Sequence, residues 1–341
     1  KFMNFVSDTN QIFIVGSSRS GTTMMGRILA NAPNIFTFRE LHFFGTLWTN
    51  KGNQELIKKD QVDLLSRLLC IQERGLFHQT DFVDFHSRSQ SIIGKEIKNP
   101  LMIYRLFLKT ITEDNCAKIS CEQTPQNLYY LDEILRFFPN AKVINLVRDP
   151  RDVLLSQKNK WRRRFLGAKA IPISEALRSY FNYHPILTAK VWNSSLSCTT
   201  KYLNHPQVKV VKFENLLSDS ENVVKDICRF LKIDFQDNML KVPVMGSSTE
   251  NDSKSDLIID SKKINKWKKG GLSKGEIYLS QKMSSVMMAK FDYEKKEFII
   301  PPLSIIFYLL LLPMKLGFSF LLNISRMGDV IEVIKKRFFI K

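Results

Sequence analysis

The sequence predicts an α/β fold in which a parallel sheet is flanked by helices. Three short apolar runs, at residues 11–16, 143–147 and 208–213, have the length and the β-branched content of buried strands. A segment with apolar residues at helical spacing follows each run, and such helices are the connections that parallel strands require. Of the 341 residues, 44% are hydrophobic and 25% are charged, which excludes a disordered or fibrous chain.

The first strand–helix unit carries a candidate anion-binding loop. A strand is expected at residues 11–16 (QIFIVG) and a helix at residues 22–30, and residues 16–23 (GSSRSGTT) join them. Glycines allow consecutive N–H groups to face an anion, and the positive end of the following helix adds to the attraction. The candidate phosphate-binding residues of this loop are Ser18, Arg19, Ser20, Gly21, Thr22 and Thr23.

The loop is similar to a Walker A loop but lacks its lysine. Thr22 follows Gly21 where that motif has Lys, so the nearest cation of the loop is Arg19. This difference disfavours a kinase or NTPase, which stays an alternative as a degenerate phosphate loop. A plain glycine turn that caps a helix is the other alternative.

The second and third units repeat the pattern. A helix at residues 127–138 ends before Pro139, and the strand at residues 143–147 leads through the sequence RDPRD into a further helix. The strand at residues 208–213 (VKVVKF) is paired with a helix at residues 222–231. Since these strands alternate with helices, we expect both faces of the sheet to be covered.

The charge balance predicts a polyanionic partner. Lys and Arg number 51 and Asp and Glu 33, which gives a net charge of +18. A phosphorylated cofactor, nucleic acid, an acidic acceptor or an anionic membrane would each fit. The five cysteines are too few for a disulfide-dense scaffold and show no zinc spacing, so no metal is expected. Cys116 and Cys121 are expected either to pair in an oxidising compartment or to be two buried thiols.

The C-terminal residues 298–341 form a separate apolar and basic tail. Prolines and Lys315 interrupt the apolar part, and its longest clean stretch, residues 303–312, is shorter than the ~20 residues of a spanning helix. The last part is basic, with Lys335, Lys336 and Arg337. We expect either a tail that lies on or re-enters an anionic membrane surface, or a pair of apolar helices that pack on the domain.

The loop and a second segment resemble the sulfotransferases that use 3′-phosphoadenosine-5′-phosphosulfate, most closely the tyrosylprotein and membrane-associated branch. In that family the strand–RSGTT–helix unit binds the 5′-phosphosulfate end. Arg148, at the end of a strand, and Ser156, eight residues later, resemble the 3′-phosphate motif. Phe213 resembles the aromatic residue near the adenine, and Lys266, before Trp267, resembles a late lysine that reaches the 3′-phosphate.

The resemblance covers residues 11–295 and implies a P-loop-like nucleotide-binding core within a catalytic domain at residues 1–297. It implies transfer of a sulfuryl group to a hydroxyl of protein tyrosine, glycan or lipid, with 3′,5′-bisphosphoadenosine as product and no metal. Glu40, 21 residues after Arg19, stands where the tyrosylprotein branch has its glutamate base, so Glu40 and Arg19 are the candidate catalytic residues. The alternatives are a surface pair of Arg39 with Glu40, and His42 as the base.

One position departs from the family. Many relatives carry Glu-Lys-Thr-Pro where this chain has Gln123 in place of the lysine, so an expected cation at the leaving group is absent. Three explanations stay open: Arg19 does more, Lys95 or Lys98 substitutes, or the enzyme is slow.

The residues Arg162, Arg163 and Arg164 indicate an acidic acceptor, whereas the wider basic stretches at residues 158–164 and 262–269 also fit nucleic acid or a membrane surface. A non-catalytic module that binds nucleic acid or membrane is the remaining alternative, but no nucleic-acid motif supports it. Membrane association is expected either at a bacterial cytoplasmic face or in a Golgi-type lumen. An N-terminal anchor that precedes Lys1 is a further expectation left open.

Overall fold

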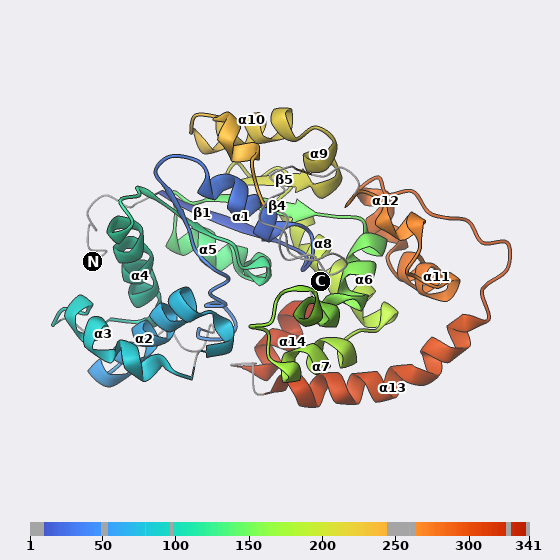
Figure 1. Ribbon diagram of the computed structural model, residues 1–341, viewed down its shortest axis with the longest axis horizontal. Helices are drawn as coiled ribbons and strands as arrows, with labels where there is room; N and C mark the ends of the chain where they lie inside the picture. Colours follow the sequence, from blue (N-terminus) through green and yellow to red (C-terminus); the bar gives the residue numbers. More distant parts are fainter. Residues whose placement is uncertain are drawn as a thin grey trace.

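The computed structural model describes residues 10–48, 54–78, 80–95, 98–243, 259, 263–324 and 329–338. A parallel five-stranded sheet with the order β2-β3-β1-β4-β5 lies at its centre, and helices cover it (Figure 1). The predicted fold class is therefore confirmed. The strands are β1 (Asn10–Gly16), β2 (Ile35–Thr37), β3 (Ile119–Glu122), β4 (Lys142–Val147) and β5 (Val208–Lys212).

Fourteen α-helices are found in the described residues. They are α1 (Thr22–Ala30), α2 (Lys58–Arg74), α3 (His86–Ile92), α4 (Pro100–Asp114), α5 (Leu131–Phe137), α6 (Pro150–Lys158), α7 (Ile173–Phe181), α8 (Pro185–Lys201), α9 (Phe213–Ser218), α10 (Ser220–Leu231), α11 (Lys274–Met283), α12 (Ser285–Lys290), α13 (Ser304–Asn323) and α14 (Val330–Phe338). Short 3-10 helices join several of them, among which η4 (Pro125–Tyr130), η5 (Lys160–Leu166) and η8 (Lys266–Lys269) matter below.

The apolar side chains of β1 point alternately to the two faces of the sheet, and each set belongs to a different hydrophobic cluster. Phe13 and Val15 belong to the cluster that includes side chains of α2, α4 and α5. Ile12 and Ile14 belong to the cluster that includes side chains of α1, α9 and α10. Successive side chains of a strand point to opposite faces, so this one apolar run contributes to both layers.

Two predicted elements differ in detail. The helix expected at residues 127–138 is split into η4 and α5, because the Asn127 side chain donates to the Glu122 carboxylate and holds the first part close to β3. The strand expected at residues 208–213 ends at Lys212, and Phe213 begins α9 instead, with its ring packed against the first loop.

Parallel strands bring their carboxyl ends to one edge of the sheet. β1 pairs with β4, and β4 pairs with β5, so the segments that follow these three strands lie next to each other. Gly16 makes the close approach possible, since a Cβ there would lie 2.2 Å from the carbonyl oxygen of Leu146. The loop, the RDPRD sequence and Phe213 therefore meet at this edge.

The tail contains an unbroken helix where an interruption was expected. α13 is 20 residues long and continues through Pro313. A proline inside a helix removes one hydrogen bond, but α13 is fixed to the domain on both sides of Pro313, through Tyr308 and Lys315. Among the described residues it is the one helix long and apolar enough to cross a membrane.

α14 folds back beside α8. Lys336 forms an ion pair with Glu133, so the expectation that this lysine faces a membrane is wrong: its charge holds the tail to the domain. Lys335 is exposed. The Arg337 side chain and residues 339–341 lie outside the described part of the chain.

The five cysteines are free, so Cys116 and Cys121 are not paired in this structure. Cys121 is buried in β3, as expected of a core thiol. Cys116 is exposed, because it lies in the turn before β3 with a positive φ of 54°.

Candidate active site

The loop after β1 forms a tight turn into α1. Arg19 and Gly21 adopt left-handed backbone conformations, with φ of 72° and 95°. Gly21 is the N-cap of α1 and provides no side-chain cap, which leaves the first N–H groups of the helix available to an anion. A Cβ on Gly21 would lie 2.4 Å from the Phe213 ring, so the ring closes directly over the loop.

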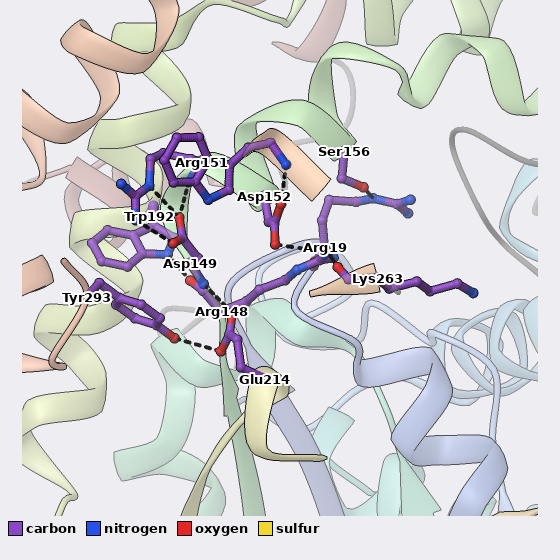
Figure 2. Close-up of polar contacts among 11 residues, drawn as sticks. Arg19, Arg148, Asp149, Arg151, Asp152, Ser156, Trp192, Glu214, Lys263 and Tyr293 are labelled. Carbon is purple, nitrogen blue, oxygen red and sulfur yellow. Dashed lines mark hydrogen bonds and ion pairs between the residues drawn. The ribbon is translucent and has the colours of Figure 1, made fainter. Parts of the chain in front are cut away.

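Arg19 connects this loop to the second motif. Its Nε donates a hydrogen bond of 2.8 Å to Oγ of Ser156 on α6 (Figure 2). The Nη1 of Arg148, in turn, donates over 3.2 Å to the carbonyl oxygen of Arg19. The structure thus brings together three of the predicted donor-binding residues.

Burial and neighbouring cations both change the pKa of Arg19. Burial lowers the pKa of its guanidinium, the charges of Arg163 and Arg148 lower it further, and Glu40 acts in the opposite direction, so the pKa is about 10. The side chain is therefore still charged at neutral pH, in a surrounding that is already rich in positive charge.

Arg148 lies at the centre of the site. Its guanidinium lies 4.5 Å from the centroid of the Phe213 ring, and its Nη2 donates over 3.2 Å to the carbonyl oxygen of Lys263. Its Nη2 also lies 3.7 Å from the Asp152 carboxylate. The Nε of Arg148 is buried and has no hydrogen-bond partner among the described residues. A buried N–H donor without a partner is costly, so this atom fits a site that an anion completes.

The rest of the RDPRD sequence is structural. Asp149 caps α6 by accepting from the backbone N–H of Arg151 over 2.8 Å. Its carboxylate also accepts from the Arg151 guanidinium over 3.0 and 2.6 Å, and this guanidinium stacks on Trp267 at 3.9 Å. The start of α6 is therefore stabilised by the ion pair of Arg151 with Asp149, and Arg148 precedes it at the end of β4.

Three residues that the sequence did not single out hold this backbone in place. Glu214 accepts from the backbone N–H of Asp149 over 2.8 Å, and the Tyr293 hydroxyl donates to Glu214 over 3.1 Å (Figure 2). The indole N–H of Trp192 donates to the carbonyl oxygen of Arg148 over 2.9 Å. Of the three, only Glu214 lies beside a candidate site residue in the sequence, since it directly follows Phe213.

The segment of Lys266 lies against the start of α6. The backbone N–H of Trp267 donates to Asp152 over 2.9 Å, and the carbonyl oxygen of Lys263 accepts from Arg148. Lys266 itself begins η8 and is half-buried. Lys262, which precedes this segment, lies outside the described residues.

Glu40 follows β2 and is a partly exposed carboxylate. Its Oε2 lies 3.4 Å from Nε2 of His42, and its side chain is 40% exposed. Burial by itself raises the pKa of Glu40, but the contact with His42 and the charges of His42, Lys160 and Arg19 outweigh it, so the pKa lies below its ordinary value. Glu40 is thus paired with His42 and lies close enough to Arg19 for the two charges to interact.

A buried carboxyl holds the Glu40 loop in place. Glu122, at the end of β3, accepts from the backbone N–H of Leu41 over 3.2 Å and from that of Thr124 over 3.1 Å. The Thr124 hydroxyl accepts from the backbone N–H of His42 over 3.2 Å. Burial raises the pKa of Glu122 to about 7, against the hydrogen bonds from Thr124 and Leu41. The sequence showed only a glutamate before Gln123 and gave no sign of this contact.

Gln123 is packed beneath the same loop. Its Nε2 donates over 2.9 Å to the carbonyl oxygen of Phe38, and its Oε1 lies against Gly26, where a Cβ would be 2.4 Å away. The side chain is therefore fixed between β2 and α1. It supplies no charge to the site.

Lys160 is the further cation that the structure brings to Glu40. It begins η5, four residues after Ser156, and its charge acts on Glu40. Burial lowers the pKa of Lys160 to about 8, with contributions from Arg19, Arg178 and Arg163 and an opposing one from Glu40. The sequence placed Lys160 in a basic stretch and nothing there set it apart, because α6 ends at Lys158 and only the fold brings Lys160 close to Glu40.

Similarity to known proteins agrees with a site built from these segments. Residues 11–237 match the model of the Sulfotransferase family. An uncharacterized protein of Aquifex aeolicus (strain VF5) is 24% identical over 293 residues, which is 76% of this chain. The match covers 30% of the Aquifex protein, so the chain spans about a third of that relative's length.

Two solved structures have the same fold. The sulfotransferase domain of the Synechococcus PCC 7002 olefin synthase is similar with a TM-score of 0.53 and 20% identity, over 87% of this chain and 99% of that domain. The sulfotransferase domain of the curacin biosynthetic pathway is similar with a TM-score of 0.51 and 19% identity, over 84% of this chain and 99% of that domain. Because the family match extends over more than half of the chain and includes both candidate anion-binding segments, the chain belongs to the sulfotransferase family.

Proposed function

We propose that this chain transfers a sulfuryl group from 3′-phosphoadenosine-5′-phosphosulfate to an acceptor hydroxyl. The observation that carries the proposal is the hydrogen bond from Arg19 to Ser156, which joins the two anion-binding segments into one site. The partnerless Nε of Arg148 and the uncapped start of α1 fit a ligand with phosphate groups at both ends.

The residues of the site divide between the two ends of the donor. The first loop would hold the 5′-phosphosulfate, through the N–H groups and hydroxyls of Ser18, Ser20, Gly21, Thr22 and Thr23. Arg148 and Ser156 would hold the 3′-phosphate, with Lys266 from the covering segment. Phe213, which packs on Gly21 and under Arg148, would lie beside the adenine.

In the proposed reaction, Glu40 and two cations take part in the chemistry. When bound, the donor supplies the sulfuryl group: a bond forms from the acceptor oxygen to sulfur, the bond from sulfur to the 5′-phosphate oxygen breaks, and 3′,5′-bisphosphoadenosine is the product. Glu40 takes the proton of the acceptor hydroxyl, and its lowered pKa keeps it ionised at neutral pH. Arg19 and Lys160 offset the negative charge that develops near Glu40 and on the leaving phosphate.

The basic residues of η5 are candidates for contact with the acceptor. Arg163 acts on the charge of Arg19, whereas Arg162 is exposed beside the Trp161 ring. Arg164 donates to the carbonyl oxygens of Lys169 and Ile171 and so holds its own loop. An acidic acceptor that meets Arg162 and Arg163 is therefore part of the proposal, as is membrane association through residues 298–341.

The test is transfer of label from the sulfonucleotide to a panel of tyrosine peptides, glycans and lipids. Glu40→Gln is expected to lower the transfer rate by about 100-fold or more, since general base catalysis contributes about 10²–10⁴. Glu55→Gln, at an exposed carboxylate in the part of the chain that precedes α2, is the matched control and keeps the rate. Magnesium-dependent ATP turnover without sulfuryl transfer would instead identify a degenerate P-loop NTPase.

A further inference from the structure

The helix α13 carries its polar side chains on the side that faces the protein. The Tyr308 hydroxyl lies 3.1 Å from Oγ of Ser273, and Nζ of Lys315 donates to the carbonyl oxygen of Tyr180 over 3.0 Å. Asn323 accepts from Nη1 of Arg178 over 2.7 Å. These three side chains recur at helical spacing, so they form one polar stripe along α13 that contacts the domain.

The opposite side of α13 is apolar and exposed. Leu310 is 75% exposed and Leu321 is 67% exposed, and further exposed large apolar side chains on this side are Ile306, Phe307 and Phe320. A surface helix of a water-soluble domain has the reverse arrangement, with its apolar stripe towards the core. The outer side of α13 is thus suited to contact an apolar environment rather than water.

The contacts of α13 with the domain extend along most of its length. They begin at Ser304, the first residue of the helix, which lies against Gly275 of α11, and end at Asn323, the last residue. α13 lies along the outer edge of the molecule, beside α7 (Figure 1). A helix that crosses a bilayer is surrounded by lipid, whereas α13 has one side against protein, so it is suited to lie in the plane of a membrane interface.

Neighbouring side chains enlarge the apolar surface. Ile173 and Leu177 of α7 are 59% and 54% exposed, and Phe165 of η5 is 67% exposed. The net charge of +18 decides between two occupants of this surface. Two copies of so basic a chain repel each other, whereas an anionic bilayer attracts each of them.

The same elements lead from α13 to the site. Lys160, whose charge acts on Glu40, begins η5, and the next residue, Trp161, packs edge-on against Tyr180 at 6.0 Å. Nζ of Lys315 on α13 lies 4.5 Å from the centroid of the Tyr180 ring. The side chains of Trp161 and Tyr180 therefore connect η5, which begins at Lys160, with Lys315 of α13.

We propose that α13 lies in the interface of an anionic bilayer and that the acceptor is a hydroxyl carried by a lipid of this bilayer. The inference rests on the proposed sulfuryl transfer and names its substrate class. The lipid oxygen forms the bond to sulfur, its proton passes to Glu40, and 3′,5′-bisphosphoadenosine leaves.

Vesicle flotation tests the surface. Vesicles of phosphatidylcholine and phosphatidylglycerol are expected to carry the wild-type chain upwards in a density gradient. The double variant Leu310→Glu/Leu321→Glu is expected to lose at least about tenfold in bound fraction, because two apolar side chains that would be buried in the interface are replaced by charged ones. Val83→Glu, at another exposed apolar residue (59% exposed), is the matched control and keeps binding. Equal flotation of wild type and double variant, or no flotation of wild type with a dimer in solution, overturns the proposal.

Transfer of label tests the acceptor. The probes are vesicles of phosphatidylglycerol and galactosyl diacylglycerol, which both carry free hydroxyls, and soluble methyl galactoside. The wild type is expected to label the vesicle lipid, and the double variant to label it at least about tenfold more slowly with unchanged calorimetric affinity for 3′,5′-bisphosphoadenosine. Label on methyl galactoside or on tyrosine peptides but on neither lipid overturns the lipid acceptor and leaves the sulfotransferase function intact. No affinity for 3′,5′-bisphosphoadenosine in any variant would mark failure of the proposed function itself.

Discussion

The Nε of Arg19 lies 2.8 Å from Oγ of Ser156, although 137 residues separate them in the sequence. The contact exists because β1 and β4 are neighbouring parallel strands, so the loop after one and the helix after the other begin at the same edge. Since Arg148 also donates to the carbonyl oxygen of Arg19, the two segments hold each other in position. The site is thus assembled by the sheet rather than by either segment alone.

Lys160 is expected to limit activity at alkaline pH. Its pKa is about 8, so in the wild type kcat/KM falls as pH rises through about 8 and the ammonium loses its charge. Lys160→Arg keeps the charge, and its fall in kcat/KM is expected to move to higher pH. The measurement is the pH profile of both proteins, with Lys169→Arg, at an exposed lysine of the same loop region, as the control. An identical alkaline limb in all three proteins would assign it to another group.

Glu122→Gln is expected to slow the transfer without weakening donor binding. The amide cannot accept from all the donors that face the carboxylate, namely the backbone N–H groups of Leu41 and Thr124, the Thr124 hydroxyl and the Asn127 amide, so the Glu40 loop loses its fixed position. We expect kcat to fall by about 10-fold or more while the calorimetric affinity for 3′,5′-bisphosphoadenosine is kept, consistent with the cost of a misplaced catalytic group. A parallel loss of donor affinity would argue against a role confined to this loop.

The same variant has a pH signature in stability. The pKa of Glu122 in the folded protein is about 7, above its ordinary value of 4.5, so the folded state binds this proton more tightly than the unfolded state does. Stability that is fully present below pH 4.5 is lost as pH rises through about 7. The unfolding free energy of the wild type is therefore expected to decline relative to that of Glu122→Gln over this interval, as measured by urea unfolding at several pH values. A constant difference across the interval contradicts the buried, titrating carboxyl.

Arg151→Ala is expected mainly to lower the stability of the protein, whereas Arg148→Ala is expected mainly to weaken ligand binding. Arg151 is buried, pairs with Asp149 and stacks on Trp267, so its loss leaves a buried carboxylate without its cation and costs about 3–5 kcal/mol of stability. Arg148 has a buried Nε without a partner, so its loss is expected to affect ligand binding more than unfolding. Thermal unfolding separates the two, and a larger drop in Tm for Arg148→Ala would reverse these assignments.

The sequence was sufficient where local signals and the sheet pattern agreed. β1, the loop and α1 were predicted almost to the residue, because a strand ending in glycine, a turn and a helix with a clear stop follow one another. β2 and β3 were missed, since they have three and four residues and β3 contains Ser120 and Glu122 rather than an apolar run.

Contacts between distant segments were beyond the reach of the sequence. The hold of Glu122 on the Glu40 loop depends on β3 lying beside β2, a pairing that no local pattern encodes. Lys160 looked like one of several solvated cations until the fold placed it near Glu40. The prediction that Pro313 interrupts the helix was wrong for a related reason. Contacts with α7 and α11, which are distant in the sequence, keep α13 continuous.

The most direct test is calorimetric titration of 3′,5′-bisphosphoadenosine into the wild type, Arg19→Ala, Arg148→Ala and the control Arg136→Ala, at an exposed arginine of α5. We predict that the wild type and Arg136→Ala bind equally. Arg19→Ala and Arg148→Ala are each expected to lose about 100-fold or more, because charge-assisted hydrogen bonds to phosphate contribute about 1.5–3 kcal/mol apiece and each arginine can form more than one. Wild-type affinity in both Arg19→Ala and Arg148→Ala would contradict a donor site built from these two segments.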